Sequence, residues 1–195
     1  RISAMRAFAR AYNINLDEAE KPLEEYQSVG DLFTRKLKED ARPSGSGLVH
    51  PCDARVAEAG VIQNSKISQV KGIEYPVPAL LQNDEMASRF IDGSFVTYYL
   101  CPTDYHRVHA PLDLTVEWVG HIPGALWPVN SWSVRNVDPL YAINERVALV
   151  FRTNEGESLA LVMVAATNAG SISISFDDRI NTGVRPKGRN KTAYT

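Results

Sequence analysis

The chain has 195 residues, of which 44% are hydrophobic and 23% charged, a composition typical of a globular protein and not of a disordered one. Its formal net charge of −2 at pH 7 gives no general attraction to nucleic acid, and the one basic cluster, RPKGRNK at residues 185–191, is expected to be a solvated tail. Two cysteines, Cys52 and Cys101, are too few for a disulfide framework or a cysteine-based zinc site, and no apolar run approaches the roughly 18 residues of a membrane span.

The first predicted element is an amphipathic helix within residues 1–14. Apolar side chains recur there at helical spacing: Ile2, Met5, Phe8 and Tyr12. Arg1, Arg6 and Arg10 occupy other positions on the same turns, so the helix has a basic side. Such a helix either docks on its own domain or lies on a membrane surface, and the sequence leaves both roles open.

A second helix is expected within SVGDLFTRKLKE, residues 28–39. Ser28 can cap its first turn, and Asp31, three residues later, can complete a capping box. The helix should end before ARPSGSG at residues 41–47, because proline and glycine mark a loop there.

After this loop the pattern changes to β. Short segments rich in Val, Ile, Phe and Tyr alternate with turn residues: GSFVTYYL (93–100), LTVEWVGHI (114–122), ERVALVFR (145–152), SLALVMVAA (158–166) and SISISF (171–176). The segments at 145–152 and 158–166 are joined by TNEGE, which predicts a hairpin. A helix is expected to interrupt the β pattern at VPALLQNDEMASRF, residues 77–90. We therefore expect an α+β fold, with N-terminal helices in residues 1–42 followed by a mainly antiparallel β sheet or sandwich core in residues 43–195.

The segment CPTDYHRVHAP, residues 101–111, holds two of the four histidines of the chain, His106 and His109. In an extended strand these two rings would point to opposite faces, but the prolines of the segment favour a bent loop that can bring the rings together. A single histidine is usually structural, whereas two histidines on one loop favour a site. The neighbouring polar residues are expected to frame the loop first and to contact a substrate second: Asp104, Tyr105 and Arg107.

A second candidate lies in HPCDARV, residues 50–56, where Asp53 either caps a turn or orients a histidine. The residue pattern does not choose between these roles, and no G-x-S-x-G elbow supplies a nucleophile. A metal site formed by His106, His109 and Asp53 is a weaker alternative, because the chain has neither the H-E-x-x-H pattern nor a Cys/His cluster to complete four ligands.

Seven segments, taken together and in order, resemble the phosphatidylserine decarboxylase family. They are FTRKLKEDARP (33–43), HPCDARV (50–56), QVKGIEY (69–75), DYHRVHAP (104–111), PGALWPVN (123–130), NERV (144–147) and AATNAGSI (165–172). Each segment alone is a weak signal. Seven in the order of the family, spread over nearly the whole chain, are specific.

The resemblance implies a carboxy-lyase of phospholipid biosynthesis that converts phosphatidylserine to phosphatidylethanolamine. Enzymes of this family are made as proenzymes that cut themselves at a Gly-Ser bond, and the serine becomes a covalent pyruvoyl cofactor at the N-terminus of the α chain. By the resemblance, Asp53 and His109 serve this self-cleavage and His106 serves the later decarboxylation. No metal is implied.

The sequence departs from the family pattern at two places. Ala54 follows Asp53, where the family usually has glycine, and the chain stops at Thr195 without a Leu-Gly-Ser-Thr motif. Gly170 and Ser171 form a Gly-Ser pair, but they belong to the AATNAGSI segment, which is a structural strand in the family. The chain is therefore interpreted as a β-chain portion that is inactive without its α chain.

Under this interpretation the expected partners are the α chain of the same proenzyme, phosphatidylserine and a membrane surface, and a homodimer is left open. Residues 1–42 would be membrane-proximal and residues 43–195 catalytic, at a bacterial or mitochondrial inner membrane. Two alternatives stay open: a catalytically silent lipid-binding protein of the same fold, and a metal-dependent hydrolase.

Overall fold

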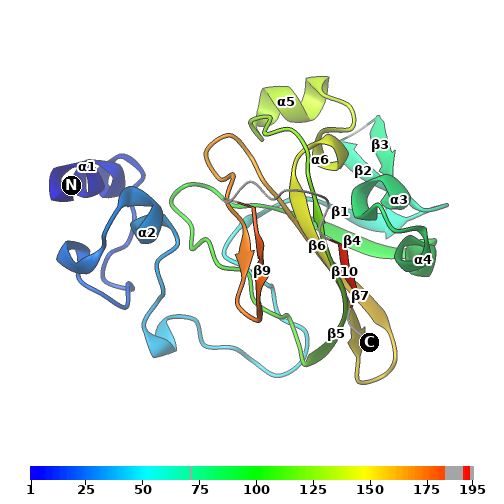
Figure 1. The fold of residues 1–195 in the computed structure, drawn as a ribbon, viewed down its shortest axis with the longest axis horizontal. Helices are drawn as coiled ribbons and strands as arrows, with labels where there is room; N and C mark the ends of the chain where they lie inside the picture. Colours follow the sequence, from blue (N-terminus) through cyan, green and yellow to red (C-terminus); the bar gives the residue numbers. More distant parts are fainter. Residues whose placement is uncertain (71, 183–190, 194–195) are drawn as a thin grey trace. The chain divides into compact units, whose positions relative to one another are not determined.

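The computed structural model describes residues 1–70, 72–182 and 191–193, so most of the basic cluster predicted as a tail lies outside the described residues (Figure 1). Contacts group the chain into a first unit, Arg1–Ala57 with Thr97–Asp113, and a second unit, Glu58–Val96 with Leu114–Thr195. This grouping follows contacts, whereas the division expected after residue 42 followed the change from helical to β patterns. The expected roles of residues 1–42 and 43–195 stay predictions.

A two-stranded sheet is formed by β1 (Arg55–Ile62) and β4 (Gly93–Tyr99). The β4 strand confirms the prediction made for residues 93–100. The loop that follows β4, residues 100–113, therefore begins at a paired strand and belongs to the first unit.

The first unit begins with α1 (Ile2–Ala11), which confirms the predicted amphipathic helix. Its apolar side packs inside the unit, in a cluster of buried residues: Met5, Ala9, Ile14, Leu23, Tyr26 and Leu32. Of the two roles left open for this helix, docking on its own domain accounts for its apolar side. Within the described ranges, no helix is long and apolar enough to cross a membrane.

α2 (Val29–Phe33) begins at the predicted cap but is shorter than predicted. The Ser28 hydroxyl accepts a hydrogen bond from the Asp31 N–H at 3.0 Å, and the Asp31 carboxylate accepts one from the Gln27 N–H at 2.9 Å. The chain then turns extended, because residues 36–38 pair with residues 18–20 through backbone hydrogen bonds. Two short 3-10 helices, η1 (Leu23–Glu25) and η2 (Glu39–Ala41), complete this part of the unit.

The second unit is built on a four-stranded antiparallel sheet in the order β10-β5-β6-β7. Its strands are β5 (Leu114–Ile122), β6 (Arg146–Thr153), β7 (Ser158–Val164) and β10 (Lys191–Ala193). β6 and β7 form the predicted hairpin. Alternate side chains of β6 enter two different clusters, Val147 and Leu149 in one and Ala148 and Val150 in the other, because successive side chains of a strand point to opposite faces. The sheet is therefore covered by apolar side chains on both faces.

Shorter elements complete the second unit. They are β2 (Lys66–Val70) paired with β3 (Ile73–Pro76), β8 (Ser173–Ile174) paired with β9 (Asp177–Asn181), and the helices α3 (Val77–Leu81), α4 (Asp84–Ala87), η3 (Ser88–Phe90), α5 (Ser131–Asn136) and α6 (Leu140–Ile143). The helix predicted at 77–90 is broken at Gln82, which has a positive φ of 48°, and Asn83 then caps α4. The strand predicted at 171–176 is reduced to two residues. Helices and antiparallel sheets together confirm the α+β class.

Candidate active site

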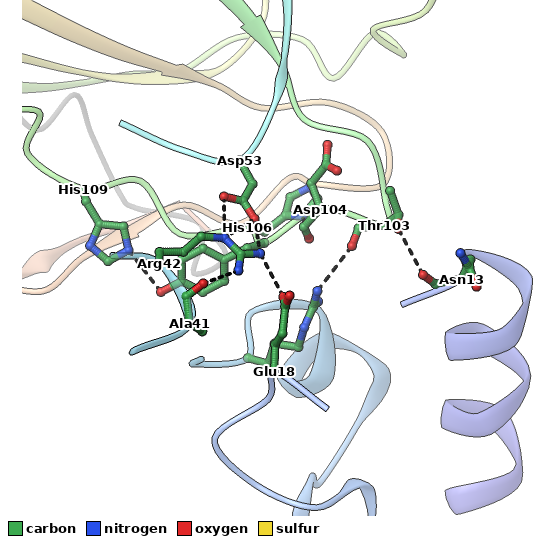
Figure 2. Close-up of polar contacts among 11 residues, drawn as sticks. Asn13, Glu18, Ala41, Arg42, Asp53, Thr103, Asp104, His106 and His109 are labelled. Atoms are coloured by element: carbon green, nitrogen blue, oxygen red, sulfur yellow. Dashed lines mark hydrogen bonds and ion pairs between the residues drawn. The ribbon is translucent and has the colours of Figure 1, made fainter. Parts of the chain in front are cut away.

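All three predicted site residues, Asp53, His106 and His109, lie in the first unit (Figure 2). Residues 100–113 form neither helix nor strand, so the predicted bent loop is confirmed. The His109 N–H donates to the Pro51 carbonyl at 2.8 Å. This backbone contact places the histidine loop beside the segment that carries Asp53, although the two motifs are about fifty residues apart in the sequence.

Asp104 shapes the start of the loop. Its carboxylate accepts a hydrogen bond from the Cys101 N–H at 2.6 Å, and its own N–H donates to the Cys101 carbonyl at 2.9 Å. The Asp104 carbonyl lies 3.0 Å from Nδ1 of His106. A carbonyl only accepts, so Nδ1 carries the hydrogen and Nε2 is the basic nitrogen of the neutral His106 ring.

The His106 ring is partly buried against Phe33, with ring centroids 3.8 Å apart. Burial lowers the pKa of His106 below its ordinary value of 6.5, and the Arg35 cation acts in the same direction, although the Asp104 carbonyl and charge oppose it. The imidazole is therefore mainly neutral at pH 7, with Nε2 able to accept a proton.

His109 has a different partner. Its Nε2 lies 3.0 Å from the Tyr105 hydroxyl, and the two rings are stacked with centroids 5.6 Å apart. Burial raises the pKa of Tyr105, so the hydroxyl stays protonated near neutrality. Tyr105, expected first to frame the loop and second to contact a substrate, thus contacts one of the two candidate histidines directly.

The Asp53 carboxylate is held by Arg42, which sequence reasoning did not single out. Arg42 Nε lies 3.0 Å from both carboxylate oxygens, and Nη2 lies 2.6 Å from Oδ2. In the part of the chain that the structure describes, no hydrogen bond joins Asp53 to His109. The only hint of Arg42 in the sequence is its place in the FTRKLKEDARP segment of the resemblance.

The histidine loop is also tied to the N-terminal residues of the same unit. Arg35 Nη2 donates to the Thr103 carbonyl at 3.2 Å, and Arg107 Nε donates to the Thr34 carbonyl at 2.9 Å. The Thr103 hydroxyl donates to the Asn13 carbonyl at 3.3 Å, as Figure 2 shows. These contacts fit the framing role expected for Arg107.

Cys52 lies next to Asp53, but its thiol is a poor nucleophile there. Burial, helped by the charge of Asp53, raises the pKa of Cys52 to about 11, so the thiolate is scarce at neutral pH. Among the described residues, no group of three or more His, Cys, Asp and Glu side chains is arranged to hold a metal ion.

Three other segments of the resemblance meet in the second unit, at the buried side chain of Asn144. Its amide nitrogen donates to the carbonyls of Trp127 and Ala165, each at 2.9 Å, and its amide oxygen accepts the Trp127 N–H at 3.1 Å. Gly124 is required nearby, because a Cβ there would lie 2.4 Å from the Ile143 carbonyl oxygen. The hydrogen bonds of the Asn144 side chain thus hold together the segments PGALWPVN, NERV and AATNAGSI.

The chain is similar to known phosphatidylserine decarboxylases. The family profile described as phosphatidylserine decarboxylase matches residues 29–189. The chain is 43% identical to the phosphatidylserine decarboxylase proenzyme of Myxococcus xanthus over 179 residues, which cover 90% of the chain and 64% of that relative. It is 43% identical over 183 residues to the proenzyme of Anaeromyxobacter sp., covering 92% of the chain and 64% of the relative.

A third relative, the phosphatidylserine decarboxylase proenzyme of Aliivibrio fischeri, is 40% identical over 189 residues, which cover 94% of the chain and 66% of the relative. The chain therefore spans a little under two thirds of the length of these curated relatives. The profile match at residues 29–189 includes Arg42, Asp53, His106 and His109.

Proposed function

Because the chain belongs to the phosphatidylserine decarboxylase family, we propose that it is the β-chain portion of a self-processing enzyme that converts phosphatidylserine to phosphatidylethanolamine and CO2. The observation that carries the proposal is the gathering of Asp53, His106 and His109 in one unit, on two segments joined by the hydrogen bond from His109 to Pro51.

The whole protein would use a pyruvoyl group, made from a serine beyond this chain, whose carbonyl withdraws the electrons released when CO2 leaves. The hydrogen-bonding state of His106 suits a residue that acts beside such a group. Its Nδ1–H is taken by the Asp104 carbonyl, and its Nε2 has no hydrogen-bond partner in the described ranges. Nε2 is therefore available to move a proton at a reacting atom.

His109 and Asp53 are proposed to serve self-cleavage. His109 would accept the proton of the attacking serine hydroxyl, and the Asp53 carboxylate would offset the positive charge that the ring acquires. His106, which is mainly neutral at pH 7, would take up a proton during turnover and return it to the α-carbon of the product.

The test uses the protein expressed from its complete gene, measured by intact mass with and without a reagent that traps carbonyls. Two fragments, the smaller with a trappable N-terminal carbonyl, support the proposal. Asp53→Ala or His109→Ala should block cleavage, whereas His106→Ala should permit cleavage and reduce CO2 release. Normal cleavage in both Asp53→Ala and His109→Ala would remove these residues from self-cleavage, and a single uncut wild-type chain would favour a catalytically silent lipid binder.

The remaining expectations are part of the same proposal. We infer an α chain as the obligatory partner and a bacterial or mitochondrial inner membrane surface as the place of work, because the substrate named for the relatives is a phospholipid. The three arginines of the α1 region give residues 1–42 a basic side suited to anionic headgroups.

A further inference from the structure

Arg42 lies between two carboxylates that come from different parts of the first unit, as Figure 2 shows. Nη2 contacts Asp53 Oδ2 at 2.6 Å and Glu18 Oε2 at 2.9 Å, and Nη1 donates to the Ala41 carbonyl at 2.6 Å. With Nε bound to Asp53, all three guanidinium nitrogens have a partner. Planar, multiply bonded arginine contacts of this kind fix the geometry of a carboxylate as well as its charge.

Glu18 is itself held in place. Its carbonyl accepts the Lys38 N–H at 2.9 Å, and the Glu20 N–H donates to the Lys36 carbonyl at 2.9 Å. These bonds join the segment that carries Glu18 to the segment that leads to Arg42, so the relative position of the two side chains is set by the backbone. The hydrogen-bond network of Glu18, Arg42 and Asp53 is therefore supported by backbone pairing and is not a contact between two mobile side chains.

Asp53 needs such support. Its side chain is 29% exposed, so an unheld carboxylate would sample several rotamers. Other charged or ionisable groups around it are Glu18, Arg35, Cys52 and Tyr105, and none of these is hydrogen-bonded to it in the described part of the chain. The hydrogen bonds that Arg42 donates, first to Asp53 and then to Glu18, raise the pKa of Arg42, so Arg42 stays a cation at every relevant pH.

We propose that Arg42 is the positioning residue for Asp53 in self-cleavage, and that Glu18 fixes Arg42 in this role. The inference rests on the proposed function of Asp53. It makes the N-terminal helical segment part of the self-cleavage machinery, through Glu18, in addition to any role at a membrane.

The experiment follows the rate of self-cleavage in the full-length proenzyme. Arg42→Ala should slow cleavage about tenfold or more, because a carboxylate that is no longer held departs from the geometry that the reaction needs, and added methylguanidinium should partly restore the rate. Glu18→Gln should slow cleavage less than Arg42→Ala does. The matched control is Arg152→Ala in the second unit, because Arg152 also bonds one carboxylate through two nitrogens and its side chain is 46% exposed against 44% for Arg42.

The outcomes separate this inference from the proposed function. Cleavage of Arg42→Ala at the wild-type rate or faster, while Asp53→Ala stays uncut, would overturn the inference and leave the proposed function in place. A normally cut Asp53→Ala would overturn the inference together with the role proposed for Asp53, whereas a single uncut wild-type chain would overturn the proposed self-processing function itself. If circular dichroism shows that Arg42→Ala does not fold, a folded Glu18→Gln decides: slowed cleavage supports the inference, and wild-type cleavage overturns it.

Discussion

At the scale of single residues, His106 and His109 differ in environment although they are three positions apart. His106 packs on Phe33, whereas His109 stacks on Tyr105. The first contact buries the ring and disfavours its charged form, and the second supplies a hydroxyl beside Nε2. Two histidines of one loop thus differ in chemistry, because His106 contacts Phe33 from outside the loop and His109 contacts Tyr105 of the loop itself.

The lowered pKa of His106 predicts a pH dependence of stability. The unfolded chain binds the proton near pH 6.5 and the folded chain binds it only at lower pH, so the unfolded state gains protons first as the pH falls. The stability that depends on a neutral His106 is therefore complete above about pH 6.5 and is lost as the pH falls below it.

The measurement compares urea unfolding at pH 7.5 and pH 5.5, followed by circular dichroism because the first unit contains no tryptophan. His106→Gln should lose less unfolding free energy between the two pH values than the wild type does, by at most about 1.4 kcal/mol, because pH 5.5 lies one unit below the ordinary histidine pKa. Equal losses in both proteins would contradict the burial argument.

At the scale of elements, the sequence patterns correctly predicted the helices and strands that local periodicity determines. β5 occupies the predicted residues 114–122, and α1 and the β6-β7 hairpin also formed as predicted. α2 ended early because residues 36–38 pair with residues 18–20, a tertiary contact that no local pattern encodes. For the same reason the motifs nominated Asp53 and both histidines, but not Arg42, whose role depends on two side chains at other places in the fold.

The exposed arginines of α1 are predicted to attract anionic membrane surfaces. The apolar side of this helix is used inside the first unit, so any attraction to a membrane must come from its exposed arginines. In the full-length protein, Arg6→Glu together with Arg10→Glu should reduce sedimentation with anionic vesicles and leave sedimentation with neutral vesicles unchanged. The matched control, Lys66→Glu with Arg152→Glu, changes the net charge equally in the second unit. Equal losses in both double variants would assign the effect to net charge and not to α1.

At the scale of the whole molecule, the two units can be followed separately, because all three tryptophans, Trp118, Trp127 and Trp132, lie in the second unit. The largest fully buried side chain among the described residues of that unit is the charged Arg146, which is 1% exposed. Its guanidinium donates to four carbonyls at 2.6 to 2.8 Å, at the ends of α3 and α6: Leu80, Ala79, Ala142 and Asn144. Burial lowers the pKa of Arg146 to about 10, which still leaves it charged near neutrality.

Arg146 therefore joins β6 to two helix ends whose last carbonyls have no partner inside their own helices. Arg146→Met fills much of the volume but removes four hydrogen bonds to a charged donor, and we expect a loss of about 3 kcal/mol or more in unfolding free energy, partly offset because no charge is then buried. The loss should appear in the urea transition detected by tryptophan fluorescence.

Arg152→Met, at an exposed ion pair of the same unit, should cost about 1 kcal/mol or less. Equal shifts for the two variants would show that the four carbonyls do not depend on Arg146, whereas a shift confined to Arg146→Met would identify it as the residue that holds the helices on the sheet.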